Sequence, residues 1–266
     1  MVLGLTREEL DRYSRQLIFP KIGIDGQKRL KAGKVAVIGL GGLGSAAATY
    51  LACAGIGCIR LIDRDVVELN NLQRQILYDE HDAKRHTQKA VSAKERLEKL
   101  NSDITVEAAC VDFNQKTARN LIKGMDIVVD GTDNLKARYM LNEVCVMERK
   151  PFVHGAALGD VGAVTMIVPG RTPCLNCIYP RGREHLIPQT CETAGVIGLV
   201  PGLIGILETM EVIKFLAGFG EQLTSRLLYV YPSSMTFDAV NIKSDPDCDV
   251  CSSLHQTQKK EAQSKL

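Results

Sequence analysis

Three glycines at the spacing G-x-G-x-x-G are the first residues of this chain whose types and positions point to chemistry. Gly39, Gly41 and Gly44, with Gly42 between them, follow a short apolar run and precede an alanine-rich segment. In a strand–turn–helix unit the first glycine permits a tight turn, the second lets backbone amides approach phosphate, and the third lets the helix pack on the strand. Asp63, nineteen residues after Gly44, stands where an acid can bind ribose hydroxyls. The pattern predicts a nucleotide site without distinguishing a dinucleotide from ATP.

Polar residues follow Asp63 at the point where an NAD-dependent dehydrogenase would continue through plain βα units. We expect them at the carboxyl ends of parallel strands, the edge at which open α/β sheets bind ligands. Arg74 and Lys89 can neutralise phosphate oxygens, and Asp133 can hold Mg²⁺, which prefers carboxylates and phosphates. A triphosphate with its metal is therefore the favoured ligand. The candidate residues are Asp65, Asn71, Arg74, Gln75, Lys89, Asp133 and Asn134.

Two further charged residues have two interpretations each. Asp130 ends a predicted strand and could either join the nucleotide site or be a buried acid that backbone amides satisfy. Arg15 lies on a predicted N-terminal helix, where a lone arginine is usually a solvated charge. The residue types alone do not assign either one to catalysis.

Four of the nine cysteines form two C-x-x-C pairs, Cys174 with Cys177 and Cys248 with Cys251. Four thiolates suffice for a closed tetrahedral Zn²⁺ site. Because four protein ligands leave no open position for substrate, we expect a structural role for this site. The alternative is two unrelated pairs or a single redox dithiol.

Cys191 stands alone in a polar loop. The N-terminus of a following helix, together with Arg181 and Arg183, could lower its pKa and make it a nucleophile. The alternative is a loop cysteine that lines the substrate channel. The other four cysteines lie in apolar periodic segments and are predicted to be core thiols; they are Cys53, Cys58, Cys110 and Cys145.

The order of apolar segments predicts the fold class. It is α/β, with a Rossmann-like, doubly wound, mostly parallel sheet extended by antiparallel strands, N-terminal helices and a zinc-bound crossover region. Buried strands are predicted at residues 34–39, 58–63, 104–109, 126–130 and 152–155, and helices at residues 45–54, 89–100, 115–123 and 135–148. Hairpin-type strands are predicted at residues 162–168, 227–231 and 235–242, with a long helix at residues 201–217.

The chain is expected to divide into three parts. Residues 1–33 form an N-terminal helical arm, in which a capping box at Thr6 starts one helix and Gly33 ends another in the left-handed conformation. Residues 34–251 form the ATP-binding domain, including the crossover loop and the zinc site. The polar residues 252–266 are expected to be a disordered tail.

Composition excludes several classes of protein. With 33 Lys and Arg against 31 Asp and Glu in 266 residues, the net charge is +2, so the chain lacks the electrostatic field of a nucleic-acid binder. No apolar run reaches the roughly 20 residues of a spanning helix, and the N-terminus lacks the apolar region of a signal peptide. We expect a cytoplasmic protein that binds neither nucleic acid nor a membrane.

Taken together, these motifs resemble the ThiF/MoeB/HesA adenylyltransferases, which are relatives of ubiquitin-activating enzymes. The resemblance runs in order from about Leu10 to Cys251. The motifs that carry it are Arg12-Tyr-Ser-Arg15-Gln16, Gly39-Leu-Gly-Gly-Leu-Gly44, Asn71-Leu-Gln-Arg74-Gln75, Asp130-Gly-Thr-Asp133-Asn134, both C-x-x-C pairs and Thr190-Cys191-Glu-Thr-Ala-Gly195.

The resemblance implies a homodimer in which each subunit adenylates the C-terminal Gly-Gly carboxylate of a small ubiquitin-fold protein. Such a carrier could be the small subunit of molybdopterin synthase, a thiamine sulfur carrier or a ubiquitin-like modifier. The products would be an acyl-adenylate and pyrophosphate, and a thioester or sulfur transfer at Cys191 could follow. The implied cofactors are ATP, Mg²⁺ and Zn²⁺.

The resemblance also implies roles for individual residues. The residue matching Arg15 would reach into the partner's site as an arginine finger, and the one matching Asp133 would bind Mg²⁺. Those that would contact ATP match Asp63, Asn71, Arg74 and Lys89. Because the segment before Lys89 reads Arg85-His-Thr-Gln where the family commonly has Gly-x-Pro, Lys84 and Arg85 are alternatives for the phosphate-binding role.

Three questions about function stay open at the level of sequence. The chain ends soon after Cys251, so we expect no rhodanese domain, and any sulfur donor would be a separate sulfurtransferase. An NAD(P)-dependent oxidoreductase that uses the glycine fingerprint is the main alternative function. A non-catalytic, zinc-stabilised binding subunit is another.

Overall fold

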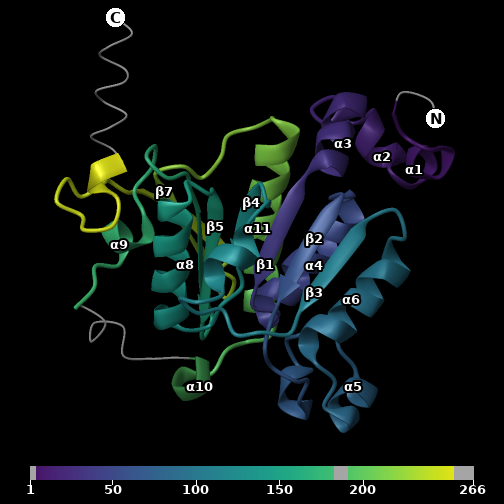
Figure 1. Cartoon of the computed structure of the whole chain (residues 1–266). Coiled ribbons are helices and arrows are strands. Elements are labelled where there is room, and N and C mark those ends of the chain that lie inside the picture. Colours follow the sequence, from purple (N-terminus) through teal and green to yellow (C-terminus); the bar gives the residue numbers. More distant parts are fainter. Residues whose placement is uncertain (1–3, 183–190, 255–266) are drawn as a thin grey trace, which may run out of the picture.

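A computed structural model describes residues 4–182 and 191–254 of the chain (Figure 1). A single eight-stranded sheet runs through it in the order β3-β2-β1-β4-β5-β6-β7-β8. The strands are β1 (Lys34–Ile38), β2 (Cys58–Ile62), β3 (Thr105–Ala109), β4 (Ile127–Asp130), β5 (Phe152–Leu158), β6 (Val161–Ile167), β7 (Arg226–Tyr231) and β8 (Thr236–Asn241).

Helices connect the strands and flank the sheet. The N-terminal ones are α1 (Arg7–Arg12), α2 (Ser14–Ile18) and α3 (Gly23–Ala32). The middle of the chain forms α4 (Gly42–Ala54), the 3-10 turn η1 (Leu69–Asn71), α5 (Glu80–Arg85), α6 (Lys89–Leu100), α7 (Ala118–Ile122) and α8 (Leu135–Met147). Later helices are α9 (Leu175–Ile178), α10 (Cys191–Ala194) and α11 (Leu199–Ala217).

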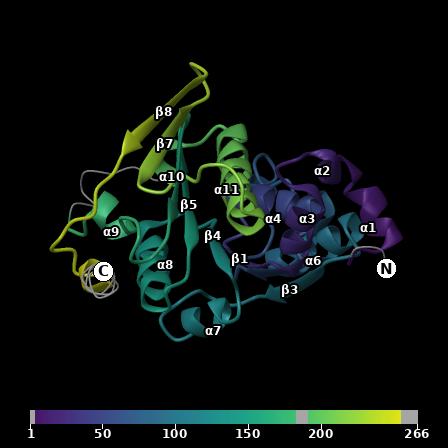
Figure 2. The ribbon, with the colours of Figure 1, turned by 90° about the horizontal axis from the view of Figure 1, so that it is seen from above.

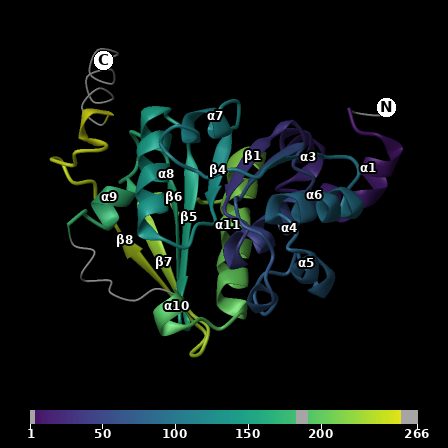
Figure 3. The same cartoon turned by 60° about the horizontal axis from the view of Figure 1, so that its bottom comes forward.

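The predicted fold class is confirmed. Strands β3, β2, β1, β4 and β5 pair in parallel, whereas β6, β7 and β8 add antiparallel strands beyond β5. The crossovers of the parallel part bring the carboxyl ends of its strands to one edge, at the lower side of Figure 1. Figure 3 turns this edge forward, with α5 and α10 beside it.

Two apolar layers hold the sheet between helices. Alternate strand residues such as Val37 and Val129 pack against α4, α6 and α11, while Ile38 and Phe152 face α7 and α8. Figure 2 shows α7 and α8 on the opposite side of the sheet from α4 and α11. Burial on both faces explains why the parallel strands are continuous apolar runs in the sequence.

The N-terminal helices depart from the predicted pattern. The capping box is confirmed, since Thr6 N donates to Glu9 Oε2 and Glu9 N to Thr6 Oγ1. The first helix breaks at Tyr13, whose buried ring packs on Gly55 and whose hydroxyl accepts from Asn101 Nδ2 at 2.9 Å. The left-handed conformation predicted for Gly33 is wrong: its φ is −68° and its ψ 143°, because the chain enters β1 directly.

Three of the four predicted core thiols are also placed differently. Only Cys145 is buried; Cys58 is half-buried, and Cys53 and Cys110 are exposed. Cys53 lies on the outer side of α4, and Cys110 follows β3, which is the edge strand of the sheet. Apolar sequence context did not predict exposure at Cys53 and Cys110, because these two side chains lie outside both apolar layers.

Within residues 4–182 and 191–254, no helix is both long and apolar enough to cross a membrane.

Glu208 is an acid in the apolar layer between α11 and the sheet. Its exposed fraction is 0%, and neither carboxylate oxygen has a hydrogen-bond partner within the described part of the chain. A Cβ at Gly155 would lie 2.5 Å from Glu208 Cδ, so the acid fits only under a glycine of β5. Burial raises the pKa of Glu208 well above its ordinary value, and the charge of Asp130 raises it further.

This raised pKa predicts a dependence of stability on pH. Above the unfolded pKa, about 4.3, the unfolded chain loses the Glu208 proton before the folded chain does. Glu208 therefore reduces the free energy of unfolding as pH rises from that value toward its folded pKa, by about 1.4 kcal/mol per unit of elevation. We expect Glu208→Gln to be more stable than the wild type, by a margin that grows with pH, in urea unfolding between pH 5 and 8.

The exposed Glu221→Gln is the matched control and should show no such pH-dependent margin. Parallel pH profiles for the wild type and Glu208→Gln would contradict the assignment of a neutral, buried acid.

Candidate functional site

The glycine-rich turn between β1 and α4 can be built only with glycine. Gly39 has a φ of +84°, and a Cβ on it would lie 2.6 Å from the carbonyl oxygen of Gly131. A Cβ on Gly44 would lie 1.9 Å from the carbonyl oxygen of Gly39. Gly39 thus permits the tight turn, and Gly44 permits the close packing of the helix, as their spacing predicts.

The N-terminus of α4 is open for an anion. Gly41 is the residue before the helix, and no side chain among residues 4–182 and 191–254 caps the free amides of the first turn. The nearest atom to a Cβ at Gly41 is Gln75 Nε2, at 3.9 Å, so space remains above this glycine. Gly42 packs closely instead, because a Cβ there would lie 2.8 Å from Pro201 of α11. Backbone amides and the helix dipole can bind phosphate at such a position.

Asp63 and Tyr78 hold the turn from two sides. Asp63 Oδ2 accepts from Leu40 N at 2.7 Å, and the Tyr78 hydroxyl donates to Leu40 O at 3.0 Å. Asp63 Oδ1 accepts from Asp65 N at 2.8 Å. Each carboxylate oxygen has a second lone pair, so Asp63 can still accept from ribose hydroxyls. Burial raises the pKa of Asp63, and the positive charge of Lys89 opposes that shift.

Lys89 is the lysine that faces this site. It opens α6 with only 6% of its surface exposed, and its Nζ lies 3.2 Å from Asp65 Oδ2. Lys84 is exposed on α5 and pairs with Glu80, and Arg85 is exposed on the same helix. The position beside Asp63 and Asp65 favours Lys89 over both alternatives.

The segment from η1 onward brings three predicted residues to the same edge. Asn71 and Gln75 are buried, and Gln75 Oε1 has no partner among the residues that the structure describes. Arg74 is half-buried, and its guanidinium donates to Asn70 O at 2.8 Å. A Cβ at Gly198, just before α11, would lie 2.2 Å from Gln73 O, so the start of α11 supports this segment.

Asp133 and Asn134 lie exposed in the turn after β4. Asn134 Oδ1 caps α8 by accepting from Ala137 N at 2.9 Å, and Asn134 Nδ2 donates to Asp133 Oδ1 at 3.1 Å. The exposed carboxylate of Asp133, which within the described residues accepts a hydrogen bond from its neighbour Asn134, therefore faces solvent at the sheet edge. Chemically it suits Mg²⁺, which keeps several waters beside its carboxylate ligand.

Asp130 is buried, but side chains as well as a backbone amide satisfy it. Its Oδ1 accepts from Thr132 Oγ1 and N, and its Oδ2 lies 2.7 Å from His154 Nδ1. Sequence reasoning missed His154. The only signal was its place in a predicted strand that follows the strand of Asp130.

Arg15 lies far from this edge within its own chain. It is exposed on α2, which precedes α3 and the amino end of β1, whereas the glycine turn follows the carboxyl end of β1. Figure 1 shows α1 to α3 at the opposite end of the sheet from α5 and α10. The structure does not bring Arg15 together with the other predicted residues of the same subunit.

The four cysteines of the C-x-x-C pairs converge. The Sγ–Sγ distances are 3.9 Å between Cys174 and Cys177, 3.7 Å between Cys174 and Cys248, and 3.5 Å between Cys177 and Cys251. All four sulfurs lie within 4.8 Å of one another. Four sulfurs at 2.3 Å from a tetrahedral zinc ion would stand about 3.8 Å apart, whereas a disulfide needs about 2.05 Å. The cluster therefore fits zinc and no disulfide.

Neighbouring groups complete this cysteine cluster. Asp245 N donates to Cys177 Sγ at 3.4 Å, and Asn176 Nδ2 donates to Cys248 Sγ at 3.8 Å. Such donors stabilise thiolate ligands and orient them. The cluster joins α9 to the segment after β8, so an ion there would cross-link the crossover region to the C-terminal part of the chain.

Cys191 is the first residue of α10, and its side chain lies outside the described residues, as does Arg183. Its role as a nucleophile stays a prediction. Arg181, the other arginine expected near it, forms an ion pair with Glu143 and lies 5.0 Å from the Tyr139 ring centroid.

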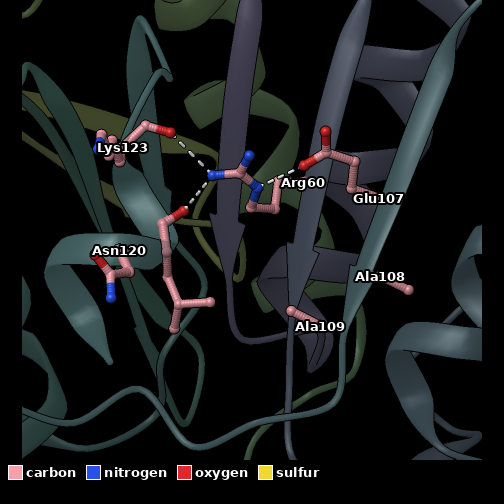
Figure 4. A pocket seen from close by; sticks show the side chains of 7 residues that line it. Arg60, Glu107, Ala108, Ala109, Asn120 and Lys123 are labelled. Carbon is pink, nitrogen blue, oxygen red and sulfur yellow. Dashed lines mark hydrogen bonds and ion pairs between the residues drawn. The ribbon is translucent and has the colours of Figure 1, made fainter. Parts of the chain in front are cut away.

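A cavity of about 330 Å³ lies away from all of these residues, between β2, β3 and the end of α7 (Figure 4). The guanidinium of Arg60 is already occupied there: it donates to Glu107 Oε2 at 2.6 Å and to the carbonyl oxygens of Leu121 and Lys123. These bonds tie α7 to the sheet, so the arginine has a structural role.

Zinc binding at the cysteine cluster can be tested by metal analysis. We expect the purified chain to hold one zinc per subunit, and Cys248→Ser to lose most of it, because three thiolates bind zinc less tightly than four. The variant should also unfold at a lower temperature. Cys110→Ser, an exposed cysteine outside the cluster, is the matched control. Equal zinc content in both variants would contradict the site.

Comparison with known proteins places this arrangement in a family. The sequence pattern of the ThiF family matches residues 13–250. The chain is 41% identical over 251 residues to the SAMP-activating enzyme E1 of Haloferax volcanii, which covers 94% of this chain and 92% of that protein. It is 43% identical over 249 residues to the adenylyltransferase and sulfurtransferase MOCS3 of Drosophila ananassae, covering 93% of this chain and 55% of that protein.

A solved structure shows the same fold. The crystal structure of E. coli MccB with ATP superposes with a TM-score of 0.81 at 27% identity, over 94% of this chain and 75% of that one. The expected resemblance is thus confirmed by both sequence and structure. The chain belongs to the ThiF family.

Proposed function

We propose that this protein uses ATP to adenylate the C-terminal Gly-Gly carboxylate of a small ubiquitin-fold carrier protein. The observation that carries the proposal is the uncapped N-terminus of α4, with Arg74, Lys89 and Asp133 at the same sheet edge. Relatives named as an activating enzyme and an adenylyltransferase support it. The chain spans about half the length of the MOCS3 relative. The sulfurtransferase activity in that relative's name is therefore not part of the proposal.

The reaction joins two anions, and the site is built to offset their repulsion. A carrier carboxylate oxygen attacks the α-phosphorus of ATP and forms a new oxygen–phosphorus bond. The bond from the α-phosphorus to the oxygen that bridges to the β-phosphate breaks, and pyrophosphate leaves with that oxygen. Arg74 and Lys89 would screen the phosphate charge, while the α4 amides hold the phosphates in line for attack. The carboxylate is already ionised at neutral pH, so no general base is needed.

Four residues would hold the rest of the nucleotide and its metal. Asp63 would accept from the ribose hydroxyls, and Asn71 and Gln75 would contribute polar groups beside the glycine turn. Asp133 would bind Mg²⁺, which supplies positive charge at the phosphates when it is bound.

We further propose a homodimer in which Arg15 completes the partner's site. Large apolar side chains are exposed on α2, α4 and α11, including Ile18 with 70% of its surface exposed, Tyr50 and Met210. Phe19 at the end of α2 packs edge-on against Phe219 after α11, so the ends of these two helices lie beside each other. Burying the exposed apolar side chains against a second copy would remove apolar area from water and carry the exposed Arg15 to another subunit.

The alternative functions have less support. An oxidoreductase would use the same glycine turn, but the relatives carry the names of activating and adenylylating proteins. A cytoplasmic location suits the eight described cysteines, none of which forms a disulfide, because a reducing compartment disfavours disulfides.

The role of Arg74 is tested by ATP–pyrophosphate exchange that depends on a Gly-Gly carrier. We expect Arg74→Ala to lower the exchange rate at least about a hundredfold, the usual scale for losing one preorganised charge donor. Arg119→Ala is the control, since Arg119 is exposed on α7 and pairs with Glu148. The site assignment fails if the two variants exchange at the same rate.

Mixed dimers test whether Arg15 acts in the partner's site. Arg15→Ala and Arg74→Ala should each be inactive alone. Random mixing of the two chains makes about half the dimers mixed, with one intact site of two, so we expect about a quarter of wild-type exchange. No recovery on mixing would show that Arg15 does not act across the dimer.

A further inference from the structure

Asp130 and His154 form a buried pair beneath the proposed metal turn. Both have an exposed fraction of 0%, and Asp130 Oδ2 lies 2.7 Å from His154 Nδ1. They stand opposite each other in the parallel register of β4 and β5. Burial lowers the pKa of His154, and the hydrogen bond from His154 lowers that of Asp130. The 2.7 Å contact suits an imidazole that donates its Nδ1 proton to the Asp130 carboxylate.

The pair continues into the turn that carries Asp133. Asp130 Oδ1 accepts from Thr132 Oγ1 at 2.6 Å and from Thr132 N at 3.2 Å, while Arg138 donates to Thr132 O at 2.9 Å. Thr132 is thus held at its amide, hydroxyl and carbonyl. Asp133 is the next residue and has no such set of bonds of its own.

This turn also touches the phosphate-binding turn directly. A Cβ at Gly131 would lie 2.4 Å from Gly39 O and 3.0 Å from Gly44 Cα. The backbones of the two turns therefore meet with no side chain between them. A shift of the Thr132 turn would move Asp133 relative to the first turn of α4.

Stability alone does not explain a histidine at this position. His154 Nε2 is buried without a hydrogen-bond partner among the described residues, and the ring stands edge-on to Tyr179 with centroids 6.1 Å apart. An unpaired buried nitrogen costs free energy that an apolar side chain of similar size would avoid. The feature that explains a histidine here is therefore its Nδ1 donor, which hydrogen-bonds to Asp130.

We propose that Asp130 and His154 are positioning residues that hold the Thr132 turn so that Asp133 meets the metal and phosphates at the N-terminus of α4. This inference rests on the proposed function, because it assumes that Asp133 binds Mg²⁺ with ATP. Neither residue touches the substrate. Both act through the Thr132 backbone and hydroxyl, much as outer ligands orient a metal-binding carboxylate.

The test compares two isosteric substitutions. Thr132→Val removes the hydroxyl that donates to Asp130, and Thr165→Val removes a buried hydroxyl on β6 that donates to Leu223 O at 3.2 Å. Thr165 stands directly opposite His154 in the sheet, so it controls for local disturbance. Calorimetry of ATP binding to the resting enzyme, titrated with Mg²⁺, measures the metal concentration at half-saturation. Carrier-dependent exchange then gives the KM for the carrier.

We expect Thr132→Val and His154→Leu to raise the half-saturating Mg²⁺ about tenfold, the lower end for losing an outer partner of a metal ligand. The KM for the carrier should stay unchanged, and Thr165→Val should match the wild type. His154→Asn, which keeps a donor near the Nδ1 position, should restore most of the Mg²⁺ affinity.

Unchanged Mg²⁺ half-saturation in folded Thr132→Val would overturn the inference, and so would an equal shift in Thr165→Val. Thr132→Val decides the question even where His154→Leu does not fold. If the wild type itself binds no Mg²⁺ with ATP, the proposed function is wrong; if it binds and Thr132→Val binds equally well, only the positioning role is wrong.

Discussion

The site depends on one close contact, the meeting of two strand-end turns without side chains between them. Gly39 and Gly44 after β1 lie against Gly131 after β4 at distances that leave no room for a Cβ. That contact is available only because β1 and β4 are parallel neighbours that end at the same edge. It brings the open N-terminus of α4 and the turn that carries Asp133 to the same edge, where the proposed nucleotide phosphates and metal would bind.

The rest of the molecule supports that edge from both sides. On one face, the beginning of α11 contacts Gly42 of α4 through Pro201, and it contacts Gln73, which is next to Arg74, through Gly198. On the other face, α8 begins at the cap formed by Asn134 and is tied to the cysteine cluster through α9, where Asn142 accepts from Leu175 N at 2.9 Å. A zinc ion in the cluster would therefore stabilise the same helix that follows the Asp133 turn.

The sequence predicted those parts of the structure that depend on residues close together in the chain. The parallel strands were predicted because strands that are buried on both faces are continuous apolar runs in the sequence. The helix at residues 89–100 was predicted because a helix that is buried on one face has apolar residues at helical spacing. The glycine turn and the two C-x-x-C pairs were found because few other residue types can do their chemistry. The break at Tyr13 and the exposure of Cys53 and Cys110 were not, since packing between distant segments decides them.

Within the site, the hydrogen-bond partner of Asp130 could not be predicted from local sequence either. Its hydrogen bond to His154 joins residues that are far apart in sequence, and only the parallel register of β4 and β5 brings them together. Local sequence does not place Arg15 either: it lies at the opposite end of the sheet from the proposed site of its own chain, and it would reach a site only in the proposed homodimer. The most direct test of the central claim is the intact mass of a Gly-Gly carrier after acid quenching with enzyme, ATP and Mg²⁺. The account predicts a carrier heavier by one adenylyl group, lost when the final glycine is removed; an unmodified carrier would contradict it.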